Sequence, residues 1–229
     1  MKKAMVWVAL AAGLVMGTTG GLWAAAGPPA SKATVRVAHI NILSDEDLDY
    51  TTVLEATLRT ANMKDLLLDV ALECGLYTRT KVVSQDGILD TSRADSGVRV
   101  RVLLDPGTPN EIVAPPGETT YCRRVQQLSA VYNGVQNCQD ENGDGTVQYD
   151  ECELTPEETE LLLDTMDASA FNFVIGDVTA GVHTIAVQAK IDLETSSDMG
   201  EAEAKAAIGN GAVTVEEVRL VRGAEIEMP

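Results

Sequence analysis

The sequence predicts a mainly β protein, an antiparallel two-sheet β-sandwich, and two observations carry that prediction. Apolar and polar side chains alternate over several segments, which is typical of strands with one face in the core and the other in water. Between these segments lie short stretches rich in glycine, proline, asparagine and aspartate, which favour turns. Many short strands separated by such turns indicate a sandwich. The predicted turns are residues 85–87, 105–110, 114–117, 179–182 and 209–212.

The alternation also identifies the side chains expected to face the core. It is clearest in four segments, and further strands are predicted over 35–43, 76–83, 170–178 and 212–221. The core-facing side chains of the four segments are Leu54, Ala56 and Leu58; Leu66, Leu68, Val70, Leu72 and Cys74; Val98, Val100, Val102 and Leu104; and His183, Ile185, Val187, Ala189 and Ile191.

Two short helices are predicted to interrupt the strands. Thr155 is a candidate N-cap, Pro156 suits the first helical position, and Glu158 completes a capping box, so a helix is expected to run to Ser169. The second follows an extended start at 119–122. Its apolar residues recur at helical spacing, and they are Val125, Leu128, Tyr132 and Val135.

The first 26 residues are predicted to be a signal peptide. Lys2 and Lys3 precede the apolar run Ala4–Met16, which is too short for an ordinary membrane span, and small residues end at Ala26. The alternative is an uncleaved anchor. We expect cleavage after Ala26, leaving a secreted or periplasmic chain with no membrane span. Residues 27–229 should then form a single β-sandwich domain, with a loop inserted at about 133–168.

The chain is strongly acidic, with 35 Asp+Glu against 17 Lys+Arg and a net charge of −18. Loss of the two lysines in the signal peptide would make the net charge −20. Such a surface repels nucleic acid and anionic lipid and attracts divalent cations. Nucleic-acid binding is therefore excluded as a predicted function.

The four cysteines are expected to form two disulfides, because an exported chain meets an oxidising environment. Three pairings are possible. Locality in the sequence favours Cys138 with Cys152 and, by remainder, Cys74 with Cys122. Reduced cysteines or another pairing remain the alternative.

The stretch between Cys138 and Cys152 has the spacing of a calcium loop. Three side chains supply hard oxygens at alternate positions, Gly145 permits a sharp turn, and Glu151 can close the shell with both carboxylate oxygens. Thr146 would contribute its backbone carbonyl and Gln148 would act directly or through water. Val147 would anchor the loop to the body of the protein. The candidate ligands of Ca²⁺ are Asp140, Asn142, Asp144, Thr146, Gln148 and Glu151.

Residues 140–151 thus resemble the EF-hand calcium loop, and no other part of the chain resembles a known family. The alternative is an Asn-Gly or Asp-Gly turn on an acidic surface. Cys152 and Pro156 depart from the exit helix of an EF-hand, and the loop is single rather than paired. The resemblance therefore implies a fixed structural site instead of a sensor that opens a groove.

Other candidate sites carry weaker signals. The acidic segment 44–50 matches no ligand spacing and favours a solvated loop over a second ion site. His39 and His183 fall within strands, where a hydrogen-bonded histidine is commoner than a ligand or base. No familiar catalytic motif is present in the sequence. Both tryptophans precede residue 27, which disfavours the aromatic sugar-stacking faces of many carbohydrate-binding modules.

These features predict an exported, non-enzymatic calcium-binding protein, serving as a surface, adhesion or assembly component. One alternative is a calcium-dependent carbohydrate-binding or adhesive module, whose partner would be a glycan or an extracellular protein. The other is a secreted hydrolase whose site is assembled from residues far apart in the sequence.

Overall fold

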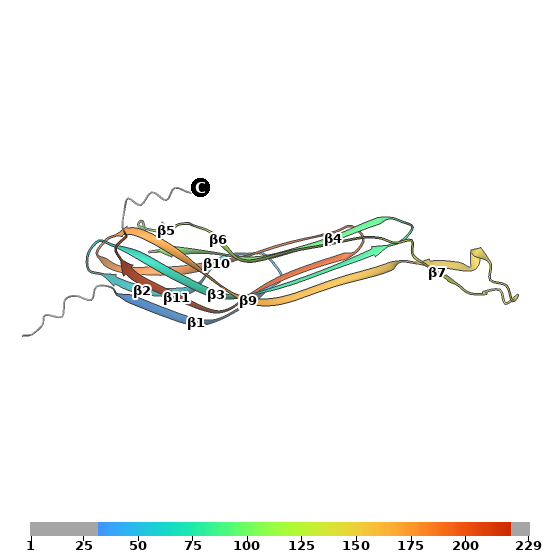
Figure 1. Ribbon diagram of the computed structural model, residues 1–229, viewed down its shortest axis with the longest axis horizontal. Coiled ribbons are helices and arrows are strands. Elements are labelled where there is room, and N and C mark those ends of the chain that lie inside the picture. Colours follow the sequence, from blue (N-terminus) through green and yellow to red (C-terminus); the bar gives the residue numbers. More distant parts are fainter. Residues whose placement is uncertain (1–31, 221–229) are drawn as a thin grey trace, which may run out of the picture. The chain divides into compact units, whose positions relative to one another are not determined.

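The computed structural model describes residues 32–220, so the predicted signal peptide lies outside the described residues. Within that range the chain is built almost entirely of antiparallel strands, as predicted (Figure 1). The elements are β1 Ala33–Ser44, β2 Leu48–Thr60, β3 Lys64–Ser84, β4 Leu89–Leu104, β5 Ile112–Val113, β6 Thr119–Val131, β7 Val135–Cys138, a 3₁₀ turn Tyr149–Glu151, β8 Cys152–Thr155, β9 Glu157–Val178, β10 Gly181–Ser197 and β11 Glu201–Val218. No helix in residues 32–220 has the length and hydropathy needed to span a membrane.

The strands form two main sheets that pack face to face, and a small third sheet. The first sheet has the order β1-β11-β3-β9, and the second has the order β2-β10-β4, with β5 and β6 both pairing with β4. The third consists of β7 and β8 alone. This arrangement confirms the predicted sandwich and places the candidate calcium loop between the two short strands of the third sheet.

An apolar core fills one part of the space between the sheets. The side chains predicted to face inward from β2, β3, β4 and β10 are all buried there, including His183 at 7% exposure. Phe173 of β9 and Val213 and Val215 of β11 add to the core from the first sheet. Period-two alternation therefore identified the buried face of each of these strands correctly.

A second part of the interior is polar. There the inward side chains of β3, β4 and β6 are mostly short and hydrogen-bonded, and Ser96 of β4 donates to the carbonyl of Lys205 on β11 at 2.6 Å. A serine is long enough to reach the facing sheet because the buried side chains on β11 beside Lys205 are small. They are the alanines Ala204 and Ala206. The buried polar residues of this region are Thr78, Thr80, Ser84, Asp90, Ser92, Ser96 and Gln126.

The helix predicted to begin at Thr155 is wrong, because residues 157–178 form the strand β9. The glutamate of the apparent capping box and the glutamate two residues after it instead form ion pairs across the sheet. Glu158 lies 2.8 Å from the ammonium of Lys81, and Glu160 lies 2.6 Å from the guanidinium of Arg79, both on β3. Pairing along the whole length of β3 overrides the local helical signal.

The predicted helix at 125–135 is also wrong, although the extended start before it is correct. The strand β6 continues to Val131, with Gln126 and Leu128 directed inward and Val125 outward at 50% exposure. The predicted turn at 209–212 is a bulge inside β11. A Cβ atom added at Gly211 would lie 2.5 Å from Cδ2 of Leu72, so a larger residue there would force the buried side chains around the bulge to shift.

Both predicted disulfides are present. Cys74 of β3 joins Cys122 of β6 and so links the two main sheets, with Cα atoms 6.6 Å apart. Cys138 joins Cys152 with Cα atoms 4.0 Å apart. Disulfides persist in oxidising environments, and both bonds indicate that the protein works in one.

Candidate metal centre

The acidic loop is closed at its base by a covalent cross-link. Cys138 ends β7 and Cys152 begins β8, and the two residues lie directly opposite each other in the antiparallel ladder. The amide of Gln139 donates to the carbonyl of Glu151 at 3.3 Å just above the disulfide. The ends of the candidate loop are therefore held together independently of any ion.

The first candidate ligand, Asp140, is turned into the loop. Its Oδ1 accepts a hydrogen bond from the amide of Gly143 at 2.6 Å, and its Oδ2 accepts one from the amide of Gly145 at 2.8 Å. Both glycines have positive φ, 73° and 85° respectively, a conformation that glycine adopts without a steric penalty. The two glycines thus allow the backbone to fold around one carboxylate.

The next two ligands continue the same pattern. The Oδ1 of Asn142 accepts from the amide of Asp144 at 2.8 Å, and the Oδ1 of Asp144 accepts from the amide of Thr146 at 2.8 Å. The backbone hydrogen bond from Thr146 is the main cause that lowers the pKa of Asp144, so this carboxyl favours its ionised form.

Glu151 reaches back across the loop from its far end. Its Oε2 accepts from the amide of Gln148 at 2.9 Å, and its Oε1 accepts from the amide of Asn142 at 3.3 Å. The side chain of Gln148 donates to Oδ2 of Asp144 at 3.3 Å. The Glu151 carboxylate is thus hydrogen-bonded to backbone amides in both the first and the second half of the loop.

This donor set fits Ca²⁺ in its chemistry. Ca²⁺ prefers six to eight oxygen ligands of mixed type, and the loop offers carboxylate, amide and carbonyl oxygens. Each carboxylate that accepts from an amide keeps further lone pairs for an ion. In residues 32–220, no group of three or more His, Cys, Asp or Glu side chains is placed so that it could hold a metal ion. The predicted donor set also relies on oxygens of Asn142, Thr146 and Gln148.

One expectation about the loop, the anchoring role of Val147, is wrong. Val147 does not anchor the loop, because it is 52% exposed, and the neighbouring Tyr149 is 83% exposed. The loop is flanked by strands on both sides rather than by the helices of an EF-hand. Its helical content is the single 3₁₀ turn Tyr149–Glu151. The resemblance to an EF-hand thus rests on the sequence spacing of residues 140–151, and the elements that flank the loop are strands.

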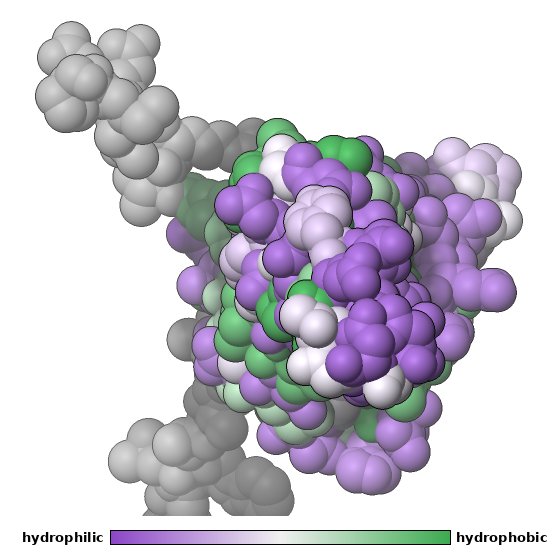
Figure 2. Space-filling model, turned by 90° about the vertical axis from the view of Figure 1, so that its right-hand side faces the viewer, coloured by the Kyte–Doolittle hydropathy of each residue, from purple (hydrophilic) through white to green (hydrophobic). Residues whose placement is uncertain are grey.

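The electrostatic surroundings of the loop favour a cation. Between Val125 and Ala189 the sequence contains no lysine or arginine, while acidic residues recur throughout. Within the loop, Asp140, Asp144 and Glu151 have no basic side chain in the neighbouring sequence to neutralise them. Hydrophilic side chains predominate on the face turned toward the viewer in Figure 2. A bound divalent ion would offset this local excess of negative charge.

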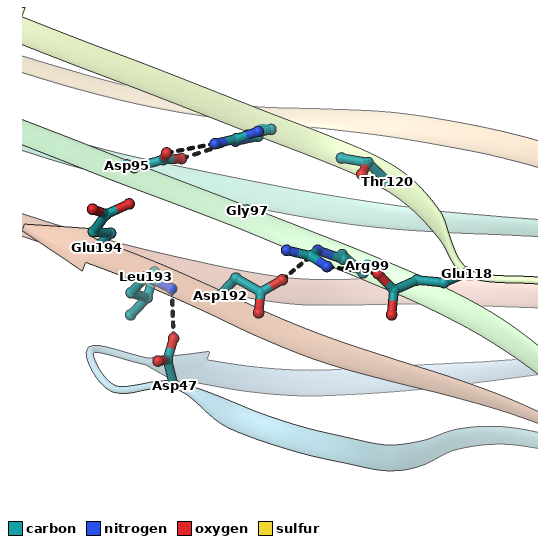
Figure 3. Close-up of a pocket in the computed structure, with 10 residues that line it drawn as sticks. Asp47, Asp95, Gly97, Arg99, Glu118, Thr120, Asp192, Leu193 and Glu194 are labelled. Atoms are coloured by element: carbon teal, nitrogen blue, oxygen red, sulfur yellow. Dashed lines mark hydrogen bonds and ion pairs between the residues drawn. The ribbon is translucent and has the colours of Figure 1, made fainter.

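A second polar feature is a hollow of about 410 Å³ on the outer face of β4, β6 and β10 (Figure 3). Arg99 lies at its centre, with Nε 2.6 Å from Asp192 and Nη1 2.6 Å from Glu118. Arg123 binds both carboxylate oxygens of Asp95, at 2.7 and 3.1 Å. The hydrogen bonds from Arg123 are the chief cause that lowers the pKa of Asp95.

The remaining acids of this hollow also have partners. Asp47 accepts from the amide of Leu193 at 2.6 Å, and Glu194 pairs with Arg93 at 3.2 Å. A set of carboxylates that are each paired with arginine or with backbone is typical of a structural ion-pair network. The hydrolase alternative gains no nucleophile–base pair in this hollow.

The two histidines and the acidic segment 44–50 each have a defined place in the fold. His39 contacts Asn210 through Nδ1 at 2.5 Å, and His183 is hydrogen-bonded through both ring nitrogens. The acidic segment at 44–50 forms the turn between β1 and β2 and the start of β2. Its Asp45 and Glu46 border an open hollow shared with Glu203 of β11. The arginine–carboxylate pairs of the 410 Å³ hollow were not predicted from the sequence, because their members come from four separated segments.

Comparisons with known proteins assign no family to this chain. No protein-family model matches the chain, and no curated protein matches it. Among solved structures, it is similar to a chain in the "Structure of infectious bursal disease virus Gx strain", with 13% identity and a TM-score of 0.27. The match covers 84% of this chain and 37% of that chain, so this chain spans less than half of that chain's length.

Proposed function

We propose that this chain is an exported, non-enzymatic calcium-binding protein in which residues 140–151 hold one Ca²⁺ as a structural element of the β7–β8 hairpin. The observation that carries the proposal is the hydrogen bonding of Glu151, which reaches both Asn142 and Gln148 and brings the last ligand over the first ones. The disulfide at the base of the loop also supports the proposal. It already holds the two ends of the loop together, so calcium binding does not have to supply the free energy of bringing them together.

The proposed site is expected to be weak. It has three formal negative charges and a single loop, which suits the extracellular range of Kd, about 10⁻⁴ to 10⁻³ M. At ten times Kd, calcium would stabilise the folded chain by about 1.4 kcal/mol. For a domain of this size that corresponds to a rise in melting temperature of roughly 3–6 °C. The apolar core lies in the other sheets, so the sandwich should stay folded without metal.

The test is thermal melting of the purified protein with calcium, with magnesium and with a chelator. Glu151→Gln keeps the shape of the side chain and should remove most of the calcium-dependent rise, while the metal-free melting temperature stays nearly unchanged. Glu153→Gln is the matched control, since this exposed glutamate lies two residues beyond the ligand set. An equal calcium shift in Glu151→Gln and the parent would show that the loop is not the site. Complete unfolding with chelator would show a larger structural role.

Calcium-dependent carbohydrate binding is a second candidate, and one observation favours it. Tyr149 is 83% exposed within the loop and presents an aromatic ring that could stack on a sugar beside the ion. A glycan array read with and without chelator separates the two functions. Binding that needs both calcium and Tyr149 would support the second, and the absence of glycan binding would leave the structural role.

A further inference from the structure

The loop after β4 contains the chain's single Asp–Pro dipeptide, Asp105–Pro106, in a strained backbone conformation. Asp105 has φ of +50°, in the left-handed region. Residues other than glycine rarely adopt this region, and a following proline restricts the backbone further. Gly107 with φ of +72° completes the turn. The Asp–Pro bond therefore lies at a point where backbone strain is concentrated.

The carbonyl group of this peptide bond is polarised by two donors. The oxygen of Asp105 accepts a hydrogen bond from Oγ1 of Thr108 at 2.8 Å and one from the amide of Thr108 at 3.3 Å. Donors in this position make the carbonyl carbon more electrophilic. They would also stabilise the negative charge that develops on the oxygen when a nucleophile attacks.

The side chain of the same residue is paired with a buried histidine. Oδ2 of Asp105 lies 2.7 Å from Nδ1 of His183, and Oδ1 accepts from the amide of Thr184 at 2.9 Å. Nε2 of His183 lies 2.9 Å from the carbonyl of Thr179, which can only accept, so this nitrogen carries a proton. Burial opposes a charge on the ring, but the bonds to Asp105 and Thr179 outweigh it and raise the pKa of His183. An acid and a carboxyl group thus lie side by side.

We propose that the protein cleaves its own Asp105–Pro106 peptide bond. In the first step a carboxylate oxygen of Asp105 attacks the carbonyl carbon of the same residue and closes a five-membered anhydride. The bond to the nitrogen of Pro106 breaks, and the nitrogen keeps the electron pair and takes up the proton supplied by His183. In the second step a water molecule opens the anhydride. The products are a chain ending in Asp105 with two carboxyl groups and a chain beginning with the amine of Pro106, and His183 regains its proton from solvent.

The site offers water and few competing bases. Asp105 and His183 line a hollow of about 380 Å³ that opens to solvent and would admit the hydrolytic water. The other ionisable groups that face it are Glu111 and Asp177. Glu111 accepts from the amide of Gly107 at 2.7 Å and so helps to hold the turn. Because attack needs an ionised Asp105 and proton transfer needs a charged His183, the rate should fall as the pH rises above the pKa of His183.

The disulfide between the main sheets would keep the cleaved chain together. Cys74 lies before the proposed cut and Cys122 after it, so the two fragments remain covalently joined through this bond. Cleavage is consequently invisible on a gel run without reductant. It appears as one added water in the intact mass and as two fragments after reduction.

The test is incubation of the purified full-length protein at about pH 5 and about pH 8, followed by reduction and mass spectrometry. We expect fragments that end at Asp105 and begin at Pro106, formed at least about tenfold faster in the folded protein than in urea at the same pH. Asp86 and Asp177 are internal controls. They have left-handed φ of 56° and 58°, but glycine and valine follow them, and both bonds should stay intact.

Substitutions separate the parts of the proposed site. Pro106→Ala and Asp105→Asn should abolish cleavage, and His183→Gln and Thr108→Val should slow it, with circular dichroism showing that each variant is folded. Asp105→Asn tests the nucleophile, and Pro106→Ala keeps the test valid if Asp105→Asn fails to fold. Equal rates in folded and urea-denatured protein, undiminished cleavage in Asp105→Asn, or an intact chain at both pH values would each overturn the proposal.

Discussion

Gln126 offers a direct test of the polar interior. Its side chain is 5% exposed and joins three strands. Oε1 accepts from Thr78 of β3 at 2.8 Å, and Nε2 donates to Thr80 of β3 at 2.7 Å and to the carbonyl of Leu161 on β9 at 2.6 Å. Replacing Gln126 with leucine keeps the approximate volume and removes all three hydrogen bonds. Two buried hydroxyl groups and one carbonyl then lose a partner.

The expected cost follows from that count. At about 1 kcal/mol for each net hydrogen bond, Gln126→Leu should lower the free energy of unfolding by about 3 kcal/mol. Replacing the threonines as well, as Thr78→Val and Thr80→Val, removes the two unpaired hydroxyls. The triple variant should therefore recover most of the loss, leaving about 1 kcal/mol for the carbonyl of Leu161.

The assay is urea denaturation followed by circular dichroism, with both disulfides intact and with an unchanged dependence on urea as the check of two-state unfolding. Gln127→Leu is the matched control, because the adjacent side chain is exposed. If Gln126→Leu lies within about 0.5 kcal/mol of the parent, or if the triple variant is less stable than the single one, the polar network does not stabilise this part of the sandwich.

Three further predictions follow from named contacts. The double variant Cys74→Ala and Cys122→Ala opens a link with a sequence separation of 48 and should lose about 4 kcal/mol in urea denaturation; no loss would mean that the sheets are joined equally well without it. The pKa of His183 is raised in the folded state, so its contribution to stability is present below the unfolded pKa of about 6.5 and is lost as the pH rises through the folded value. Melting temperature should therefore fall between about pH 6 and pH 9 by more in the parent than in His183→Gln, and parallel curves would refute the pairing with Asp105. Replacing Cys138 and Cys152 by serine should weaken calcium binding by up to about 100-fold, corresponding to the roughly 3 kcal/mol of loop closure, and unchanged affinity would show that the hairpin closes unaided.

Strand positions were predictable because burial in a sandwich imposes a period of two. Leu66 through Cys74 on β3 and Val98 through Leu104 on β4 alternate cleanly, and each predicted inward residue is buried. The rule holds where the interior is apolar. It weakens where inward positions are occupied by Thr78, Thr80 and Gln126, since nothing in a run of polar residues marks which of them face inside.

The wrong helices have a definite physical cause. From Thr155 to Ser169 the sequence satisfies local rules for a helix start, but those rules describe a segment without partners. In the folded chain Arg79 and Lys81 pair with Glu160 and Glu158, and Arg124 of β6 donates to the carbonyl of Leu163 at 3.1 Å. These partners lie far away in the sequence, so a local pattern could not reveal them.

The candidate loop was accessible from sequence because all of its proposed ligands lie within twelve positions. Spacing alone made Asp140 and Glu151 candidate ligands, and the structure adds that both side chains accept hydrogen bonds from amides of the same loop. The Asp105–His183 pair was not accessible in this way. Its members are separated by 78 positions and meet only because β4 and β10 are neighbours in the second sheet.

The measurement that tests the proposed function most directly is calorimetric titration of calcium into the metal-free protein, with Glu151→Gln measured in parallel. The account predicts one site per chain with a Kd of about 10⁻⁴ to 10⁻³ M in the parent and little or no binding in the variant. Magnesium should bind more weakly, because a site of mixed, flexible oxygens suits the larger ion. No heat of binding in the parent, or equal binding in the parent and in Glu151→Gln, would contradict the assignment of residues 140–151 as a calcium site.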